Sequence, residues 1–192
     1  MKAFQSFIDL LSSYQPVSTS LADYLAASVN EIVLPKHHLL LSQGELINKM
    51  WFLASGSARV IRWDDEALQE NTVWVYEAKE LIMPFEGVFS GQHATLPIVL
   101  NQQSTLLSLS FVHIQYLSRL FPEYHTLSQL IMESICSSLT NHLDQVQHRK
   151  IKERYHYLIS HRPQLFQSIS LKDIASFLGM SFSAIRHLRY GQ

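Results

Sequence analysis

Polar side chains near the C-terminus have the types and spacing that suit contact with a nucleic acid. Arg186 and Arg189 carry guanidinium groups, which pair with phosphate or with the edge of a guanine. Ser183 and His187 can each donate or accept a hydrogen bond, and Phe182 stands beside them. If this segment is a helix, the residues at its N-terminal end lie nearest the bases. These side chains predict binding rather than catalysis.

The segment from Leu171 to Tyr190 shows how a fold would present those side chains. Its apolar residues recur at helical spacing on both sides of one glycine: Ile174, Leu178, Met180, Ile185 and Leu188. Gly179 fits the end of a first helix, where the backbone takes a positive φ, and Ser181 fits the N-cap of a second. The pattern predicts a helix-turn-helix, with Ser181 and Lys172 also at the DNA. Any pair of packed short helices gives a similar match, so the motif alone is a hypothesis.

Charge is distributed unevenly along the chain. Residues 149–192 hold eight Lys or Arg against two Asp or Glu, whereas residues 1–148 hold seven against fourteen. The net charge of -1 therefore combines a basic C-terminal part with an acidic remainder, which favours contact with nucleic acid. Lys150, Lys152 and Arg154 suit phosphate groups, although each alone is also typical of a solvated surface.

Other groups with catalytic or metal-binding potential have simpler explanations. His37 and His38 are adjacent at the start of an expected strand, so they point to opposite faces and cannot bind one metal together. We expect one of them to be exposed and one buried. The single cysteine, Cys136, lies among apolar helix residues, which predicts a buried, inert thiol. Because the sequence has no nucleophile elbow, phosphate-binding glycine loop or zinc-ligand spacing, we expect neither an enzyme nor a metal site.

The elements before the basic module are expected to form a β-body. Apolar residues at helical spacing predict two helices, within residues 3–14 and 21–29. Over residues 30–110 the runs shorten, and breaks such as Pro35 and Gly44 separate them, which predicts antiparallel strands. The expected number is about eight, as in a double-sheet jelly roll. The fold class is therefore α+β, with helices on both sides of a β-sandwich.

A helical pattern returns after the β-body and continues from Glu123 to about His148. Its apolar stripe recurs at steps of three and four residues: Leu127, Ile131, Ile135, Leu139, His142 and Val146. So long a stripe suits a parallel helix pair across a two-fold axis, which predicts a homodimer. The alternative is that the stripe packs only on the chain's own β-body.

This order of parts resembles a known family. The segments LSQGE at 41–45, FLASGSARV at 52–60 and IASFLGMSFSAIRHLR at 174–189 resemble the Crp/Fnr family of bacterial transcription regulators. The resemblance covers nearly the whole chain and implies three parts: a cyclic-nucleotide-binding-like jelly-roll domain (a double-stranded β-helix) at 1–121, a dimerisation helix at 122–148, and a winged-helix-like helix-turn-helix domain with a curtailed wing at 149–192. It also implies a homodimer on palindromic double-stranded DNA, with RNA polymerase as a further candidate partner.

The stretch PFEGVFSGQHATLPI corresponds to the effector site of that family. The resemblance places Glu86 at a ribose hydroxyl and Thr95 beside the cyclic phosphate, with Gly87 and His93 in the same segment. Ala94, however, stands where the phosphate-binding arginine is expected. Without that cation the site loses charge-assisted hydrogen bonds worth about 1.5–3 kcal/mol each. We therefore expect an unknown small-molecule effector rather than cyclic AMP bound in the usual manner.

These features predict a cytoplasmic, dimeric DNA-binding regulator with a ligand-sensing β-body. The N-terminus lacks the unbroken apolar core of a signal peptide, and no run of roughly 18 apolar residues predicts a membrane span. Two alternatives stay open. One is a small-molecule-binding or scaffolding protein whose helix-turn-helix does not bind DNA, and the other is a cupin-type enzyme, which would carry a metal.

Overall fold

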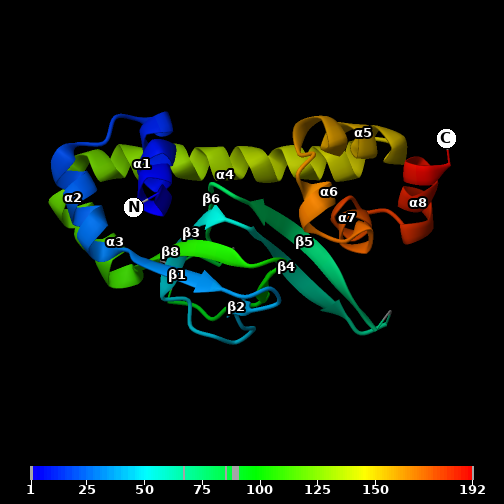
Figure 1. Cartoon of the computed structure of the whole chain (residues 1–192), viewed down its shortest axis with the longest axis horizontal. Helices are drawn as coiled ribbons and strands as arrows, with labels where there is room; N and C mark the ends of the chain where they lie inside the picture. Colours follow the sequence, from blue (N-terminus) through cyan, green and yellow to red (C-terminus); the bar gives the residue numbers. More distant parts are fainter. Residues whose placement is uncertain (1, 67, 85, 88–90, 192) are drawn as a thin grey trace.

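A β-body of two four-stranded antiparallel sheets lies under one long helix, and shorter helices are grouped at each end (Figure 1). The structure is a computed structural model, and it describes residues 2–66, 68–84, 86–87 and 91–191. The first sheet has the strand order β1-β8-β3-β6 and the second has the order β2-β7-β4-β5. This arrangement is the α+β double-sheet architecture expected from the sequence.

The strands of the described chain are β1 (Asn30–Leu34), β2 (Leu39–Leu41), β3 (Lys49–Ser55), β4 (Ser57–Asp64), β5 (Gln69–Glu77), β6 (Glu80–Ile82), β7 (Ile98–Leu100) and β8 (Ser104–Ser110). The helices are α1 (Lys2–Tyr14), α2 (Thr19–Ser28), α3 (Phe111–Leu120), α4 (Pro122–His148), α5 (Ile151–His161), α6 (Leu165–Ser168), α7 (Leu171–Phe177) and α8 (Phe182–Tyr190). α4 is the long helix of Figure 1. No strand lies within the described part of the C-terminal region, residues 149–191.

The core of the β-body forms between the two sheets and the first helices. Trp51, Phe52 and Leu53 of β3 are almost fully buried, and β8 pairs with this strand with Phe52 opposite Leu107. Gly56 makes the turn into β4 with φ +104, and a Cβ there would overlap the side chain of Ser104. Only glycine fits this turn, because both the backbone angle and the space exclude a side chain.

Two predictions about single residues are wrong. His37 and His38 are both exposed, because they lie in the turn before β2 and not within the strand. Cys136 is exposed as well, because it lies outside the packed core and lines an open cavity beside α4. In the described residues, no group of three potential metal ligands comes together, and no helix has the length and apolar character needed to cross a membrane.

The last four helices form a module with a small core of its own, α5 to α8. Its centre contains Tyr155, Leu158, Ile174 and Ile185, all buried. The fully buried Val75 belongs to the same cluster, although it comes from β5. The C-terminal module therefore packs directly on the β-body, as Figure 1 shows for α7 beside β5.

Candidate nucleic-acid interface and ligand cavity

The turn between α7 and α8 has helix-turn-helix geometry. Gly179 takes φ +62, and its N–H donates to the carbonyl of Ser176 at 3.0 Å. The hydroxyl of Ser181 accepts from the N–H of Ala184 at 3.2 Å and caps α8. A Cβ on Gly179 would lie 3.1 Å from Val146 Cγ1, so a side chain would crowd α4 as well as strain the backbone. The predicted turn glycine and helix cap are confirmed.

α8 turns its polar face to solvent. The residues predicted to face DNA from this helix and its cap are all exposed: Ser181, Phe182, Ser183, Arg186, His187 and Arg189. The Arg186 guanidinium lies over the ring of Phe182, 5.9 Å from its centroid, and Arg189 lies over Tyr190 at 5.5 Å. In the described parts of the chain, neither guanidinium has a carboxylate within ion-pair distance. This face therefore carries two cations that a phosphate backbone can bind.

Basic residues elsewhere in the module divide into two groups. The three lysines predicted to contact phosphate, Lys150, Lys152 and Lys172, are exposed. Arg154 instead donates through Nη1 to the carbonyl oxygens of Leu178, at 3.0 Å, and Gly179, at 3.2 Å. The phosphate contact predicted for Arg154 is therefore replaced by a structural contact that braces the turn before α8.

Polar contacts hold α7 on the β-body of the same chain. Arg59 of β4 reaches across β5, and its Nη1 lies 3.1 Å from Oδ1 of Asp173 in the first turn of α7. The backbone N–H of Thr72 in β5 donates to the hydroxyl of Ser176 at 2.8 Å. The ion pair is largely shielded from water, with side-chain exposures of 14% for Arg59 and 20% for Asp173, and Thr72 is buried. These contacts with the sheet thus set the orientation of the helix-turn-helix in this structure.

A second ion-pair cluster joins the end of α5 to the β5–β6 turn. Arg162 Nε lies 2.5 Å from Glu77 Oε2, and its Nη2 donates to the carbonyl of Val75 at 3.1 Å. Nη2 also lies 3.4 Å from Glu80 Oε1. Burial raises the pKa of Glu80, and the neighbouring Arg162 charge opposes that rise. The pKa of the Glu80 carboxyl therefore depends on the position of Arg162.

Three rings connect α4, α7 and β5. The His142 imidazole stacks on Phe177 with ring centroids 4.3 Å apart, and Trp74 meets His142 edge-on at 5.4 Å. Burial lowers the pKa of His142 to about 4, and the positive charge of Arg162 contributes in the same direction. His142 is therefore neutral near pH 7 and serves as a packing residue.

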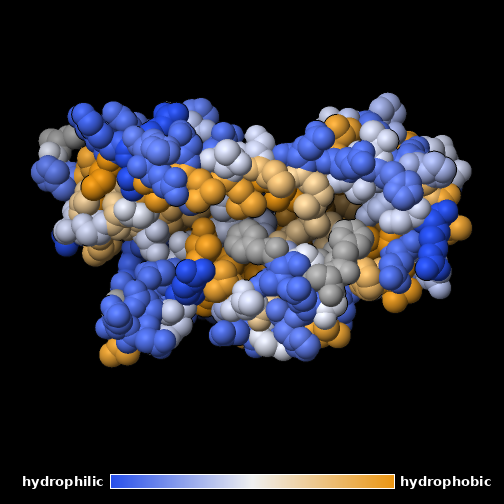
Figure 2. Space-filling model, turned by 180° about the vertical axis from the view of Figure 1, so that it is seen from behind, coloured by the Kyte–Doolittle hydropathy of each residue, from blue (hydrophilic) through white to orange (hydrophobic). Residues whose placement is uncertain are grey.

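The six-residue stripe predicted as a dimer seam faces the chain's own structure. Leu127 and Ile131 are buried in the core of the β-body, and Ile135 packs beside them. Leu139 lines a cavity against that body, His142 packs on Phe177, and Val146 lies under Gly179. The stripe is therefore used within one chain, as the alternative interpretation expected, and its use as a seam between two chains stays a prediction. Met132 and Leu143 of the same helix are 45% and 55% exposed. Figure 2 shows that apolar surface runs across the middle of one face of the molecule.

The predicted effector residues do not gather around one cavity. Glu86 accepts hydrogen bonds from the backbone N–H of Thr95, at 2.6 Å, and from its hydroxyl. Partial burial opposes ionisation of Glu86, but these bonds hold its pKa below the usual value. Ala94 is buried in backbone pairing with Glu45, and His93 is exposed. Of the predicted set, only Gly87 lines the cavity between α1, the β5–β6 hairpin and α4. Phe85, Val88, Phe89 and Ser90 of this stretch lie outside the described residues.

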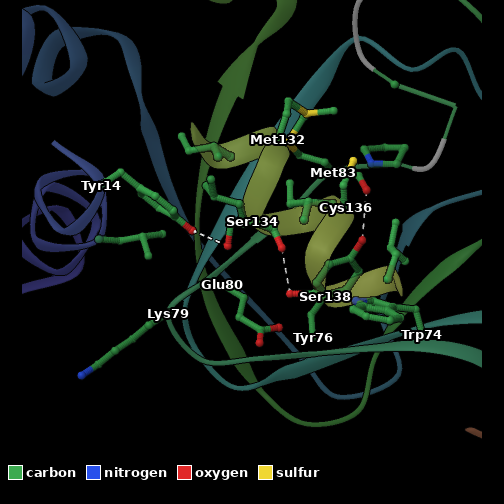
Figure 3. A pocket seen from close by; sticks show the side chains of 17 residues that line it. Tyr14, Trp74, Tyr76, Lys79, Glu80, Met83, Met132, Ser134, Cys136 and Ser138 are labelled. Carbon is green, nitrogen blue, oxygen red and sulfur yellow. Dashed lines mark hydrogen bonds between the residues drawn. The ribbon is translucent and has the colours of Figure 1, made fainter. Parts of the chain in front are cut away.

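That cavity has a volume of about 420 Å³ and lies between α1, the β5–β6 hairpin and α4 (Figure 3). Leu10 and Tyr14 line it from α1, Trp74 and Tyr76 from β5, and Leu139 from α4. The sequence offered no direct signal for this site, because its walls come from three segments that are far apart in the chain.

Comparison with solved structures places this fold among known regulators. FixK2 from Bradyrhizobium japonicum is similar with a TM-score of 0.70 and 12% identity, covering 85% of this chain and 83% of that one. The regulator CLP from Xanthomonas campestris, described as c-di-GMP responsive, has a TM-score of 0.68 and 14% identity, with 89% of both chains covered. A CooA mutant from Carboxydothermus hydrogenoformans has a TM-score of 0.67 and 17% identity, covering 96% of this chain and 83% of that one.

These structural neighbours are Crp/Fnr regulators and cyclic-nucleotide-binding-domain proteins, and they cover most of the chain. At identities this low the likeness concerns the fold, and it confirms the fold that the sequence resemblance implied. No protein-family model matches the chain, and no curated protein matches it by sequence.

Proposed function

We propose that this chain, whose fold is that of the Crp/Fnr regulators, is a DNA-binding transcription regulator that acts as a cytoplasmic homodimer and has no catalytic role. The observation that carries the proposal is the outward face of α8. Arg186 and Arg189 are exposed there without acidic partners in the described chain, on a module that holds eight Lys or Arg against two Asp or Glu. A surface of this kind attracts and orients a phosphate backbone.

The contacts to DNA follow from the position of each residue in the module. Ser183 and His187 reach the base edges from the first turns of α8, while the two arginines bind phosphate or guanine. Lys172 binds phosphate from the start of α7. Two copies of the module place half-sites one helical turn apart, roughly 34 Å, so the site is palindromic.

Dimerisation uses the face of α4 that the chain itself leaves open. Met132, Cys136 and Leu143 are exposed and share one side of the helix, because their spacings of four and seven residues return to the same side, and Met132 and Cys136 also line the cavity. Two such helices packed in parallel bury these side chains together. We place the dimer contact on this face because Leu127 and Ile131 of the six-residue stripe are already buried in the chain's own core.

Regulation passes through β5 as well as through α4. Trp74 lines the cavity and contacts Phe177 of α7, with ring centroids 6.0 Å apart. Glu80 lines the cavity and pairs with Arg162 of the module. A ligand that favours one placement of these two side chains also favours one placement of the helix-turn-helix, which couples the two sites. RNA polymerase is a candidate partner of the DNA-bound dimer.

Selection of bound fragments from random duplex DNA tests the proposal, followed by titration of a selected fragment at two salt concentrations. We expect a two-fold symmetric sequence and an affinity that falls steeply with salt. Asymmetric fragments or salt-independent binding would contradict it. A protein that binds a small molecule and no DNA would instead be the scaffolding alternative, and stoichiometric metal found by elemental analysis would favour the cupin-type enzyme.

A further inference from the structure

We infer that the cavity between α1, the β5–β6 hairpin and α4 binds a small, uncharged, largely apolar molecule and discriminates against cyclic nucleotides and other anions. Binding itself does not depend on the proposed function, whereas the role of the molecule as the effector of a DNA-binding regulator rests on it. The inference comes from the size of the cavity, the state of its polar groups and the placement of its charges.

The size and lining of the cavity suit an aromatic or aliphatic ligand. Its volume of about 420 Å³ falls within the range of small-molecule sites, roughly 300–1,000 Å³. Two aromatic rings, Trp74 and Tyr76, line it from β5, and the side chains of Ile135 and Leu139 line it from α4. Faces of this kind bind a ligand by burying apolar area and by ring stacking.

Three hydroxyl groups of the wall already donate hydrogen bonds within the protein, as the dashed lines of Figure 3 show. The Tyr76 hydroxyl donates to the carbonyl of Met83 at 3.0 Å, and the Tyr14 hydroxyl donates to Ser134 Oγ at 3.2 Å. Ser138 donates to the carbonyl of Ser134 at 2.9 Å. Because these protons are engaged, a phosphate entering the cavity would not find them ready to donate, and it would lose hydrogen bonds from water.

The charges that line the cavity oppose an anion. Lys79 is the one cation among the described lining residues, and Figure 3 shows its ammonium group directed away from the other labelled side chains. Glu80 is the one carboxylate in the same set, and its cationic partner Arg162 is not among the lining residues. An anionic ligand would therefore meet the Glu80 carboxylate in the wall, and no guanidinium lines the described part of the cavity to bind the ligand, whereas an uncharged ligand has no such penalty.

A matched pair of fluorescent probes tests this inference on the full-length protein. N-phenylnaphthylamine is uncharged, and anilinonaphthalene sulfonate has the same ring system with one added negative charge. We expect saturable binding of one uncharged probe per chain, with quenching of Trp74 fluorescence and an affinity at least about tenfold higher than that of the sulfonate. Cyclic AMP should not displace the uncharged probe.

Two variants of α4 locate the binding site. Leu139→Arg places a cation in the cavity wall, so we expect it to lose the uncharged probe and to gain the sulfonate. Ser137→Arg adds the same charge to an exposed position outside the lining, and should bind both probes as the wild type does. Unfolding curves of both variants show whether each is folded, and the reversal of charge preference is a result that misfolding cannot produce.

The inference is overturned if the uncharged probe fails to bind, if the sulfonate or cyclic AMP binds equally well, or if Leu139→Arg leaves the preference unchanged. Binding to a selected DNA fragment, measured on the same preparations, keeps the two proposals apart. If the probe does not bind but DNA does, only the inference about the ligand is refuted. If the probe binds but DNA does not, only the proposed DNA-binding function is refuted.

Discussion

The imidazole of His142 and the ring of Phe177 are stacked, with centroids 4.3 Å apart and planes inclined by 10°. This contact joins the long helix α4 to the first helix of the helix-turn-helix. It requires an uncharged imidazole, because the ring is mostly buried and Arg162 adds a positive charge nearby.

The stability of the protein should therefore fall as the pH decreases from about 6.5 towards 4. The pKa of His142 is lowered to about 4 in the folded chain, so the unfolded chain binds the extra proton between these values. We expect His142→Gln to remove about 1–2 kcal/mol of the difference in unfolding free energy between pH 7.5 and pH 5, after allowance for solvent screening. Urea unfolding at both pH values measures it.

His125→Gln is the matched control, because His125 is exposed on the same helix. It should leave the pH dependence close to that of the wild type. If both variants respond alike, the stacked imidazole is not the source of the effect.

Replacement of Arg162 by methionine should destabilise the protein more at high pH than at low pH. The methionine keeps most of the side-chain volume but leaves Glu77 and Glu80 without their guanidinium. Loss of that charge raises the pKa of Glu80 further. Unpaired carboxylates therefore destabilise the folded variant when they are ionised, and much less when they are protonated. We expect a loss of about 2–3 kcal/mol at pH 8 and a smaller loss at pH 5, from denaturant unfolding. A loss that is independent of pH would show that the contribution of Arg162 is packing alone.

Local patterns in the sequence were sufficient to predict the fold. Gly44 and Gly179 both have positive φ, and the change from helical to strand periodicity near Asn30 coincides with the start of β1. These signals are local, because a turn glycine, a helix cap or an alternating strand depends on its immediate neighbours. The sequence therefore predicted the strands, the long helix and the helix pair at the C-terminus.

Contacts between distant segments could not be predicted in the same way. The stripe on α4 has the same spacing whether it packs on its own β-body or on a second helix, so the pattern alone could not decide between them. Arg59 and Asp173 lie far apart in the chain, and nothing local marks them as partners beyond a cation within an apolar strand. The cavity walls were missed for the same reason, since Tyr14, Trp74 and Leu139 meet only after folding.

Substitution of Gly179 by alanine should disturb the module in two ways. The backbone has φ +62, and the added Cβ would lie 3.1 Å from Val146 on α4. We expect a loss of about 1–3 kcal/mol in unfolding free energy together with weaker DNA binding. Gly44→Ala is the control, since Gly44 has φ +80 but nothing in the described chain would lie within 4 Å of its added Cβ. Gly44→Ala should lose only the smaller amount of unfolding free energy that comes from backbone strain. If the two variants lose equal amounts, the contact of the added Cβ with α4 contributes nothing.

The last prediction concerns the two exposed arginines of α8. Arg186→Ala and Arg189→Ala should each weaken binding to a selected DNA fragment, by about 1–3 kcal/mol for a guanine contact and by less for a phosphate contact. A phosphate contact also lowers the slope of log K against log salt by about one, whereas a guanine contact mainly relaxes sequence preference, so titrations at several salt concentrations distinguish the roles. Arg119→Ala removes an exposed cation from α3, outside the module, and should leave affinity for the fragment and the salt slope nearly unchanged. Unaltered binding in both α8 variants, with wild-type unfolding curves, would mean that DNA contacts another face.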